Sequence, residues 1–225
     1  PMGQGKKTVS KNIKKKSETQ KNHCDKIMYQ PFDSYQQRHD HALKFLNLLY
    51  EFDDFMESIK SVADIGAGIG LDAEWWATRT TRDDDPQPLN IRVTAVVDTV
   101  NKAKQFQHKN VIWQEGNVDD TQCPPGLYDV IWCHDQFQYA LNPLQCLKHF
   151  NTLAQKDSML CLTVPTTTNL QYYKHKFISI GYYNHTLPSL SRMLAVNGWD
   201  CRDAYFKKDI NEPYIHCAVY KSAVE

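Results

Sequence analysis

The chain has 225 residues, which suits one globular domain with a substantial core, and it contains no internal repeat. Its formal net charge is zero, so no overall field favours nucleic acid as a partner. No apolar run approaches the ~18 residues of a membrane span, and the first residues lack the apolar centre of a signal peptide, so we expect a cytoplasmic protein without a membrane partner.

The cysteines and histidines are scattered rather than grouped. The seven cysteines are odd in number and contain no C-x-x-C pair, which argues against a disulfide framework or a zinc site. The nine histidines show no H-x-x-x-H or H-x-x-E-H pattern. We therefore expect no metal, and we interpret most cysteines as small apolar residues of strands and helices.

The N-terminal part separates into a polar tail and a helix. Residues 1–26 hold eight lysines against two acids, so we predict a disordered basic tail over residues 1–27, ahead of one folded domain over residues 28–225. Contact of this tail with RNA or an acidic surface is the alternative to a solvated tail. A helix is predicted from about residue 36 to 58 by one apolar face that recurs at intervals of three and four. The face consists of Ala42, Phe45, Leu46, Leu49 and Phe52.

Residues 62–70, V-A-D-I-G-A-G-I-G, join a short apolar strand to a turn that contains three glycines. Residues 71–78 follow as a predicted helix whose N-terminal end faces the turn. A dinucleotide fingerprint would need a glycine where the chain has Leu71, and a phosphate-binding P-loop would need Gly-Lys-Ser/Thr, which does not follow. The acid Asp64, two residues before the first glycine, suits a ligand with a positively charged end.

This stretch resembles motif I of the class I S-adenosylmethionine (SAM) dependent methyltransferases, D/E-x-G-x-G-x-G. The resemblance covers roughly residues 29–221 and implies SAM as the cofactor and S-adenosylhomocysteine (SAH) as the product. The motif residues that it assigns to cofactor binding are Asp64, Gly66, Ala67, Gly68 and Gly70. A glycine-rich turn without a ligand is the alternative for the motif taken alone.

In many members of that family, a segment like the predicted N-terminal helix lies over the cofactor as a lid. Tyr35 and Arg38 would then reach the methionine end of SAM, with Arg38 pairing with its carboxylate. The alternative is that both are surface residues of a helix that only packs on the domain.

Asp98 closes the second predicted strand, residues 91–97. A carboxylate at this place can accept hydrogen bonds from both ribose hydroxyls, so Asp98 is predicted to bind the ribose of SAM. Its neighbour Thr99 is a further predicted cofactor contact. Residues 102–108 are predicted to form a short helix, and residues 110–115 are predicted to form the third strand.

Residues 116–120 read G-N-V-D-D, where the resembled family usually has G-D-A. The acid of that family accepts from the adenine amino group, and the backbone of the next residue meets the ring nitrogen. Asn117 replaces the acid here, and its side-chain oxygen can still accept that hydrogen bond. The resemblance therefore implies Asn117 and Val118 as adenine contacts, with Asp119 as the other candidate for the acid.

The fourth predicted strand, residues 127–133, runs directly into His134 and Asp135. Its sequence Y-D-V-I-W resembles F-D-V-V of the family, and ligands of α/β sheets lie at the carboxyl ends of the strands. Cys133 and His134 are therefore predicted cofactor contacts, His134 through its backbone, while Asp129 is interpreted as a structural acid. The chain lacks the D/N-P-P-Y/F sequence that amino-directed DNA methyltransferases carry here, so DNA is not expected as a substrate.

The C-terminal third supplies the rest of an α/β fold. Its predicted elements are two helices (144–154, 187–196), a fifth strand (159–164) and an antiparallel pair (201–206, 214–220) joined by a turn at 209–213. Residues 166–185 are an aromatic-rich insertion, either a roof over the acceptor site or part of the core. Strands that alternate with helices predict a mostly parallel sheet covered on both faces. The resemblance implies a single Rossmann-like, doubly wound sheet of about seven strands, with an antiparallel C-terminal hairpin strand.

The predicted activity is SAM-dependent methyl transfer to a small molecule. The chain is similar to the type 11 group. Residues 182–198 loosely match that group's run Y-x-H-x-T-x-x-x-L-x-x-x-L-x-x-x-G. A macromolecule, either a protein N-terminal amine or RNA, is the alternative acceptor, and a SAM-binding protein without turnover is the alternative class. Alignment of acceptor and methyl can supply most of the rate, and a base is needed only for some acceptors. His134, Asp135 and His185 are the candidate catalytic residues.

Overall fold

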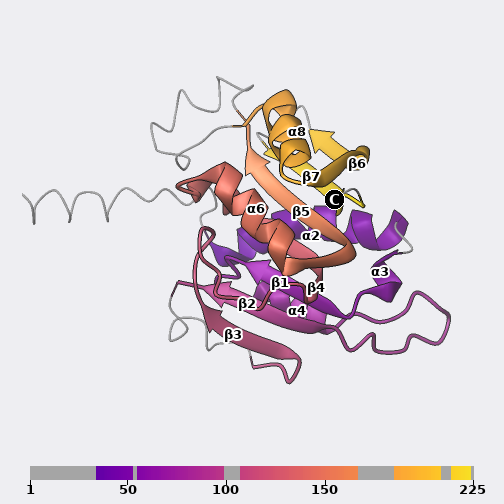
Figure 1. Cartoon of the computed structure of the whole chain (residues 1–225). Coiled ribbons are helices and arrows are strands. Elements are labelled where there is room, and N and C mark those ends of the chain that lie inside the picture. The colour runs from indigo at the N-terminus through magenta and orange to yellow at the C-terminus, as the bar shows by residue number, and fades with distance from the viewer. Residues whose placement is uncertain (1–33, 53–54, 99–106, 167–184, 209–213, 224–225) are drawn as a thin grey trace, which may run out of the picture.

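The computed structural model of the chain describes residues 34–52, 55–98, 107–166, 185–208 and 214–223 (Figure 1). Its elements, in chain order, are α2 (Tyr35–Phe52), α3 (Phe55–Ser58), β1 (Ser61–Ile65), α4 (Leu71–Ala77), β2 (Arg92–Val97), β3 (Val111–Glu115), β4 (Tyr128–His134), the 3₁₀ turn η1 (Phe137–Tyr139), α6 (Pro143–Leu153), β5 (Ala154–Pro165), α8 (Leu187–Val196), β6 (Trp199–Lys208) and β7 (Tyr214–Lys221). The tail at 1–27, most of the helix at 102–108 and of the insertion at 166–185, and the turn at 209–213 lie outside the described residues.

Seven strands form one sheet in the order β3-β2-β1-β4-β5-β7-β6. β1 pairs in parallel with β2 and β4, β2 with β3, and β4 with β5, whereas β7 runs antiparallel to both β5 and β6. The prediction of a mostly parallel sheet of about seven strands with an antiparallel C-terminal hairpin is confirmed. The strand order reverses between β1 and β4, and ligands of such sheets bind outside the carboxyl ends of the strands at this point.

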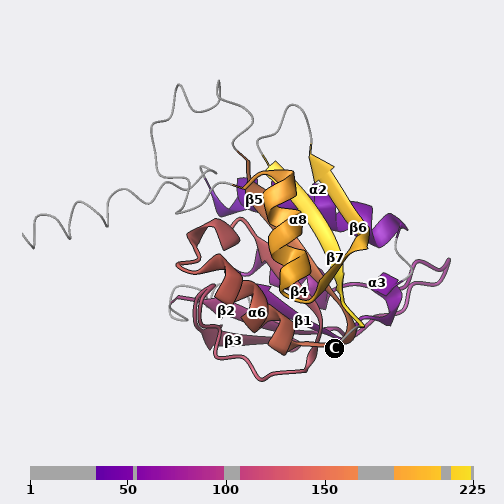
Figure 2. The same ribbon diagram turned by 45° about the horizontal axis from the view of Figure 1, so that its top comes forward.

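Helices cover both faces of the sheet, and α6 and α8 lie side by side over one of them (Figures 1 and 2). On that face, Ile131 and Cys133 of β4 pack with α6 and α8. On the other face, Val130 and Trp132 pack with α2 and α4. Because both faces are covered, the central strands are continuous buried runs. All five residues of β1 are buried, including the acid Asp64.

Asp129 joins the start of β4 to the start of β1. Its Oδ2 atom accepts hydrogen bonds from the backbone N–H groups of Lys60 and Ser61, both at 2.8 Å, and from the Ser61 hydroxyl at 2.9 Å. A carboxylate that satisfies backbone donors in this way holds the two strands together, so the structural interpretation of Asp129 is confirmed.

The helices begin and end close to the predicted positions. The helix predicted at 36–58 consists of α2 and α3, and residues 53–54 between them lie outside the described part of the chain. α6 begins at Pro143, and the side chain of Asn142 caps it by accepting from the backbone N–H of Gln145. The turn η1 has only three residues and leaves no periodic pattern in the sequence. None of the described helices is long and apolar enough to cross a membrane.

Candidate functional site

The glycine turn, Gly66 to Gly70, follows β1 where the strand order reverses. Gly66, Gly68 and Gly70 have φ angles of 78°, 61° and 94°, in the left-handed region that residues with side chains rarely adopt. The backbone N–H groups of Gly66 and Ala67 both donate to the carbonyl of Val96 at 3.0 Å. These bonds fix the turn to the end of β2, at the carboxyl edge of the sheet.

Each of the three glycines lies against a side chain from another element, and a methyl group on any of them would overlap that side chain. The distances from such a methyl carbon would be 2.1 Å to Cγ of Gln136 at Gly66, 2.8 Å to Cε1 of Tyr35 at Gly68 and 2.5 Å to Cη2 of Trp113 at Gly70. The segment after β4, helix α2 and strand β3 therefore converge on the turn.

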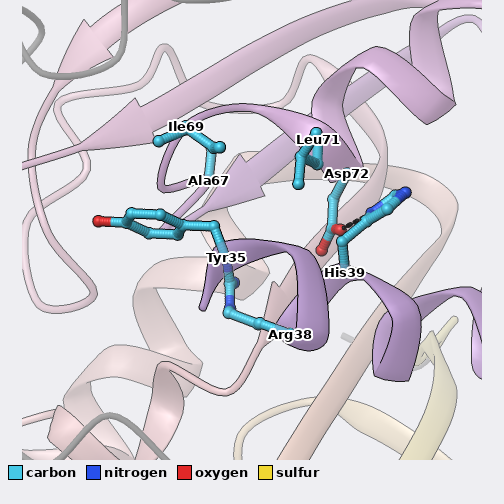
Figure 3. A pocket seen from close by; sticks show the side chains of 7 residues that line it. All are labelled: Tyr35, Arg38, His39, Ala67, Ile69, Leu71 and Asp72. Atoms are coloured by element: carbon cyan, nitrogen blue, oxygen red, sulfur yellow. Dashed lines mark hydrogen bonds and ion pairs between the residues drawn. The ribbon is translucent and has the colours of Figure 1, made fainter. Parts of the chain in front are cut away.

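A small hollow separates the turn from α2, and the ring of Tyr35 faces Ala67 and Ile69 across it (Figure 3). The hollow holds about 160 Å³ of space. Its lining residues are Tyr35, Arg38, His39, Ala67, Ile69, Leu71 and Asp72. This space is partly open to solvent and does not enclose even a water molecule, so SAM fits here only if side chains over the turn move.

Asp64 is fully buried at the end of β1, and neither of its carboxylate oxygens has a hydrogen-bond partner among the described residues. Burial, and then the nearby carboxylate of Asp72, raise the pKa of Asp64 well above its usual value. The charge of Arg38 and the backbone N–H of Ala73 lower this pKa in part. The Ala73 N–H nevertheless lies outside hydrogen-bond geometry. An orphaned buried carboxylate costs stability, so Asp64 fits a ligand that brings a positive charge or a donor.

Arg38 connects α2 to the end of β4. Its Nη2 atom donates to the backbone carbonyl of His134 at 2.6 Å, and its side chain is buried. Its Nε atom has no hydrogen-bond partner among the described residues. Arg38 therefore lines the hollow beside the glycine turn, while its pairing with the SAM carboxylate stays a prediction.

Asp72 of α4 connects α2, the helix that carries Arg38, to strand β4 of the sheet. Its Oδ1 lies 2.6 Å from Nδ1 of His39 in α2, and its Oδ2 accepts from Nε1 of Trp132 in β4 at 3.0 Å. His39 and Trp132 are 33 and 60 residues away from Asp72 in the sequence. No local pattern joins residues at such separations, so the sequence does not reveal this bridge.

Asp135 and Gln138 form a buried polar pair after β4. Asp135 has a positive φ of 54°, and its backbone N–H donates to the carbonyl of Thr163 at 3.0 Å. Nε2 of Gln138 donates to Oδ1 of Asp135 at 2.7 Å, while Oε1 of Gln138 is buried without a partner among the described residues. Burial raises the pKa of Asp135 to about 7, although Arg38 and the Gln138 bond act against the rise. Asp135 is a predicted catalytic residue, whereas Gln138 carries no sequence signal.

The two predicted catalytic histidines lie in different surroundings. His134 is fully buried, its Nε2 lies 2.9 Å from Nδ1 of His41, and burial, followed by Arg38, lowers its pKa well below the usual value. His185 stacks on Phe137 of η1 with ring centroids 5.3 Å apart, and burial lowers its pKa to about 4. His185 therefore contacts η1, the turn that also carries Gln138, whereas the ring of His134 is directed toward α2.

Asp98 is exposed at the end of β2, and Thr99 lies outside the described residues. The side-chain oxygen of Asn117 accepts from the backbone N–H groups of Asp119 and Asp120 at 2.9 and 3.0 Å. Both acceptor positions of that oxygen are then in use, which leaves the amide NH₂ for a ligand. The carboxylate of Asp119 is also engaged, because both of its oxygens accept from the backbone N–H of Leu141 at 3.0 Å.

Val118 and Cys133 lie in the core on the α6 side of the sheet. The carbonyl of Val118 accepts from Sγ of Cys146 at 3.1 Å, and burial raises the pKa of the Cys133 thiol. Both side chains are packing residues, so any ligand contact would come from their backbones. Among the residues that the structure describes, no group of histidine, cysteine and acidic side chains is arranged to hold a metal.

Residues 63–162 match the model of a protein family described as "Methyltransferase domain". This range runs from β1 into β5 and contains the glycine turn, Asp98, Asn117 and the Asp135–Gln138 pair. No curated protein matches the chain.

Solved structures share the fold at low sequence identity. A chain of the Haloferax volcanii complex between the Trm112 methyltransferase activator and a putative methyltransferase has a TM-score of 0.60 at 12% identity, over 83% of this chain and 94% of its own. A putative SAM-dependent methyltransferase from Listeria monocytogenes has a TM-score of 0.59 at 14% identity, over 81% and 99%. The Burkholderia thailandensis 1,6-didemethyltoxoflavin-N1-methyltransferase, solved with 1,6-didemethyltoxoflavin and SAH, has a TM-score of 0.55 at 14% identity, over 87% and 94%.

Proposed function

We propose that the chain is a class I SAM-dependent methyltransferase, in keeping with the family match over residues 63–162 and with the fold, and that it transfers the methyl group of SAM to a small-molecule acceptor. The observation that carries this proposal is the buried polar pair of Asp135 and Gln138, which flanks Gln136, the residue that lies against Gly66 of the glycine turn. Both side chains are buried, at 2% and 0% exposure. An enclosed site suits a small ligand better than a broad macromolecular surface.

The proposed SAM site follows the carboxyl edge of the sheet. The orphaned carboxylate of Asp64 and the glycines supply the two features that the cofactor needs, a partner for a positive charge and room for close approach. Asp98 and Thr99 are proposed for the ribose. Asn117, through its NH₂ group, and the Val118 backbone are proposed for the adenine.

The sulfonium of bound SAM supplies an activated methyl group, so the main task of the chain is to hold an acceptor in line with it. For an acceptor that loses a proton, Asp135 is the proposed base, since a carboxyl group with a pKa of about 7 is half ionised at neutral pH. His185, with a pKa of about 4, is a weaker base and is proposed to position the acceptor. The backbone carbonyl of His134 accepts a hydrogen bond from Arg38, and its ring contacts His41 of α2.

A macromolecular acceptor is the second candidate, because the eight lysines of residues 1–26 would favour an acidic partner such as RNA. A cytoplasmic location remains part of the proposal, in agreement with the six free cysteines of the described residues.

The test uses SAM that carries a labelled methyl group and a cell extract divided into low-molecular-weight, protein and RNA fractions. We expect label in the low-molecular-weight fraction, and no transfer by the Gly66→Val variant. Label found only in protein or RNA would replace the small-molecule acceptor with a macromolecule. Tight SAM binding by calorimetry without transfer to any fraction would indicate a binding protein without turnover.

A further inference from the structure

Three buried histidines from different elements meet beneath α2. His41 of α2, His134 of β4 and His216 of β7 are 8%, 0% and 4% exposed. The ring centroid of His41 lies 5.2 Å from that of His134 and 5.0 Å from that of His216. They are 93 or more residues apart from His41 in the sequence, so the fold alone assembles them.

The shortest contact in this group depends on protonation. Nδ1 of His41 and Nε2 of His134 are 2.9 Å apart, which is a hydrogen bond only if one nitrogen carries a proton and the other does not. If both rings were charged, two N–H groups would face each other in a buried space. The contact therefore requires at least one neutral ring.

The groups around His134 oppose its protonation. Arg38 and His39 face it from α2 and His216 from β7, and all of them, with His41, lower its pKa in addition to burial. The neighbouring ring of Tyr214 on β7, 4.6 Å from His41, and the hydroxyl of Thr163 on β5, 2.9 Å from Nδ1 of His216, are uncharged near neutral pH.

Two carboxylates lie nearby. Asp72 of α4 is bonded to His39 and Trp132, and Asp64 of β1 interacts with Asp72 and Arg38. Because His134 stays neutral, the hydrogen bond between His41 and His134 holds whether or not His41 carries a charge.

His41 shares its helix with the residues that reach the glycine turn. Arg38, three residues earlier and hence on the same helical face, donates to the His134 carbonyl at 2.6 Å. Tyr35, three residues before that, lies against Gly68. The ring and the carbonyl of one residue, His134, thus hold two successive turns of α2.

From this arrangement we infer that His41 is a positioning residue for the SAM site: by docking α2 on the ring of His134 it holds Arg38 and Tyr35 against the glycine turn. The inference rests on the proposed function, in which SAM binds at that turn. It predicts that SAM affinity depends on a hydrogen-bonding residue that does not touch SAM.

The test measures the SAM dissociation constant by calorimetry at pH 8 for four proteins. His41→Asn keeps a hydrogen-bonding group near the Nδ1 position, so its affinity should equal that of the wild type. His41→Leu removes that group and should bind SAM about tenfold more weakly than the wild type. His149→Asn is the matched control on α6, on the opposite face, and should behave as the wild type.

Hydrogen exchange of the amides of residues 35–52, measured without ligand, supplies a second readout. Exchange should accelerate in His41→Leu but not in His41→Asn. A SAM affinity of His41→Leu equal to that of the wild type, or α2 exchange that is unchanged in His41→Leu, overturns the inference. Absence of SAM binding by the wild type at pH 8 would instead contradict the proposed function, and the exchange experiment would still decide the role of His41.

Discussion

The guanidinium of Arg38 donates a 2.6 Å hydrogen bond to the backbone carbonyl of His134, across 96 residues of sequence. This bond fixes α2 to the end of β4, next to Asp135. The segment that the sequence suggests as a lid is therefore one wall of the candidate site. The position of α2 depends on the contacts that its buried side chains make with the strands below it.

Replacing Arg38 with methionine removes this bond and the positive charge beside Asp64, while it keeps a long unbranched side chain. We expect SAM affinity to fall by about 1–3 kcal/mol, the range for loss of a charged hydrogen-bond partner. Calorimetric titration with SAM measures the change. Arg92→Met, at an exposed position on β2, is the control and should bind as the wild type. Equal affinities of Arg38→Met and the wild type would remove Arg38 from the site.

Asp64 and Asp129 should respond in opposite ways to replacement by asparagine. The carboxyl of Asp64 ionises at its usual pKa of 3.8 in the unfolded chain but resists ionisation in the fold, so at neutral pH it destabilises the protein. Asp64→Asn should raise the melting temperature and weaken SAM binding. Asp129→Asn should lower the melting temperature, because Asp129 accepts three hydrogen bonds, and should leave SAM affinity unchanged. Destabilisation by Asp64→Asn would show that the fold itself needs this charge.

Gly68 and Gly126 separate backbone strain from ligand space. Both have a left-handed backbone, with φ of 61° and 68°, so an alanine at either position costs about 1–2 kcal/mol of stability. A methyl group would meet Tyr35 at Gly68, but it has nothing within 4 Å at Gly126. We expect Gly68→Ala to abolish SAM binding and Gly126→Ala to retain it, at similar melting temperatures. Retained binding in Gly68→Ala would contradict the proposed approach of SAM to the turn.

The sequence predicts features that depend on short-range patterns. The strand, glycine turn and helix around Gly66 lie within twenty residues, and the alternation of strands and helices determines the sheet. The role of the Asn117 side chain, in contrast, does not follow from the short-range pattern alone. This side chain accepts hydrogen bonds from the backbone two and three residues ahead, a common role of asparagine in turns, so its oxygen is occupied before any ligand arrives.

Long-range contacts are the part that the sequence does not reveal. His41, His134 and His216 appear scattered along the chain, because no spacing rule connects α2, β4 and β7. Gln138 follows Asp135 by three residues, yet nothing marks its amide as buried until η1 turns it back onto the carboxylate. The orphaned Asp64 is different, because its place in the motif suggests a ligand and its burial supports that suggestion.

The pair of Asp135 and Gln138 gives the fold a pH dependence with a defined sign. The Asp135 carboxyl ionises at 3.8 in the unfolded chain and at about 7 in the fold, so it makes the free energy of unfolding fall as pH rises from about 4 to 7. Asp135→Asn should remove this slope in denaturant titrations. Gln138→Met removes the donor that opposes the shift, so the pKa of Asp135 should rise further, which carboxyl ¹³C NMR can measure. An unchanged pKa in Gln138→Met would show that burial alone sets it.

The same pair predicts the pH profile of methyl transfer once labelled product identifies an acceptor. If Asp135 accepts the acceptor's proton, turnover falls on the acid side with a midpoint near pH 7, and Gln138→Met moves that midpoint to higher pH. The acid limb should vanish in Asp135→Asn and persist in His185→Ala, which we expect to lose about 10- to 100-fold in turnover through poorer positioning. His185 has a pKa of about 4, so as the base it would give a limb about three pH units lower. A limb near pH 4 that disappears in His185→Ala, with turnover of Asp135→Asn intact, would identify His185 as the base instead of Asp135.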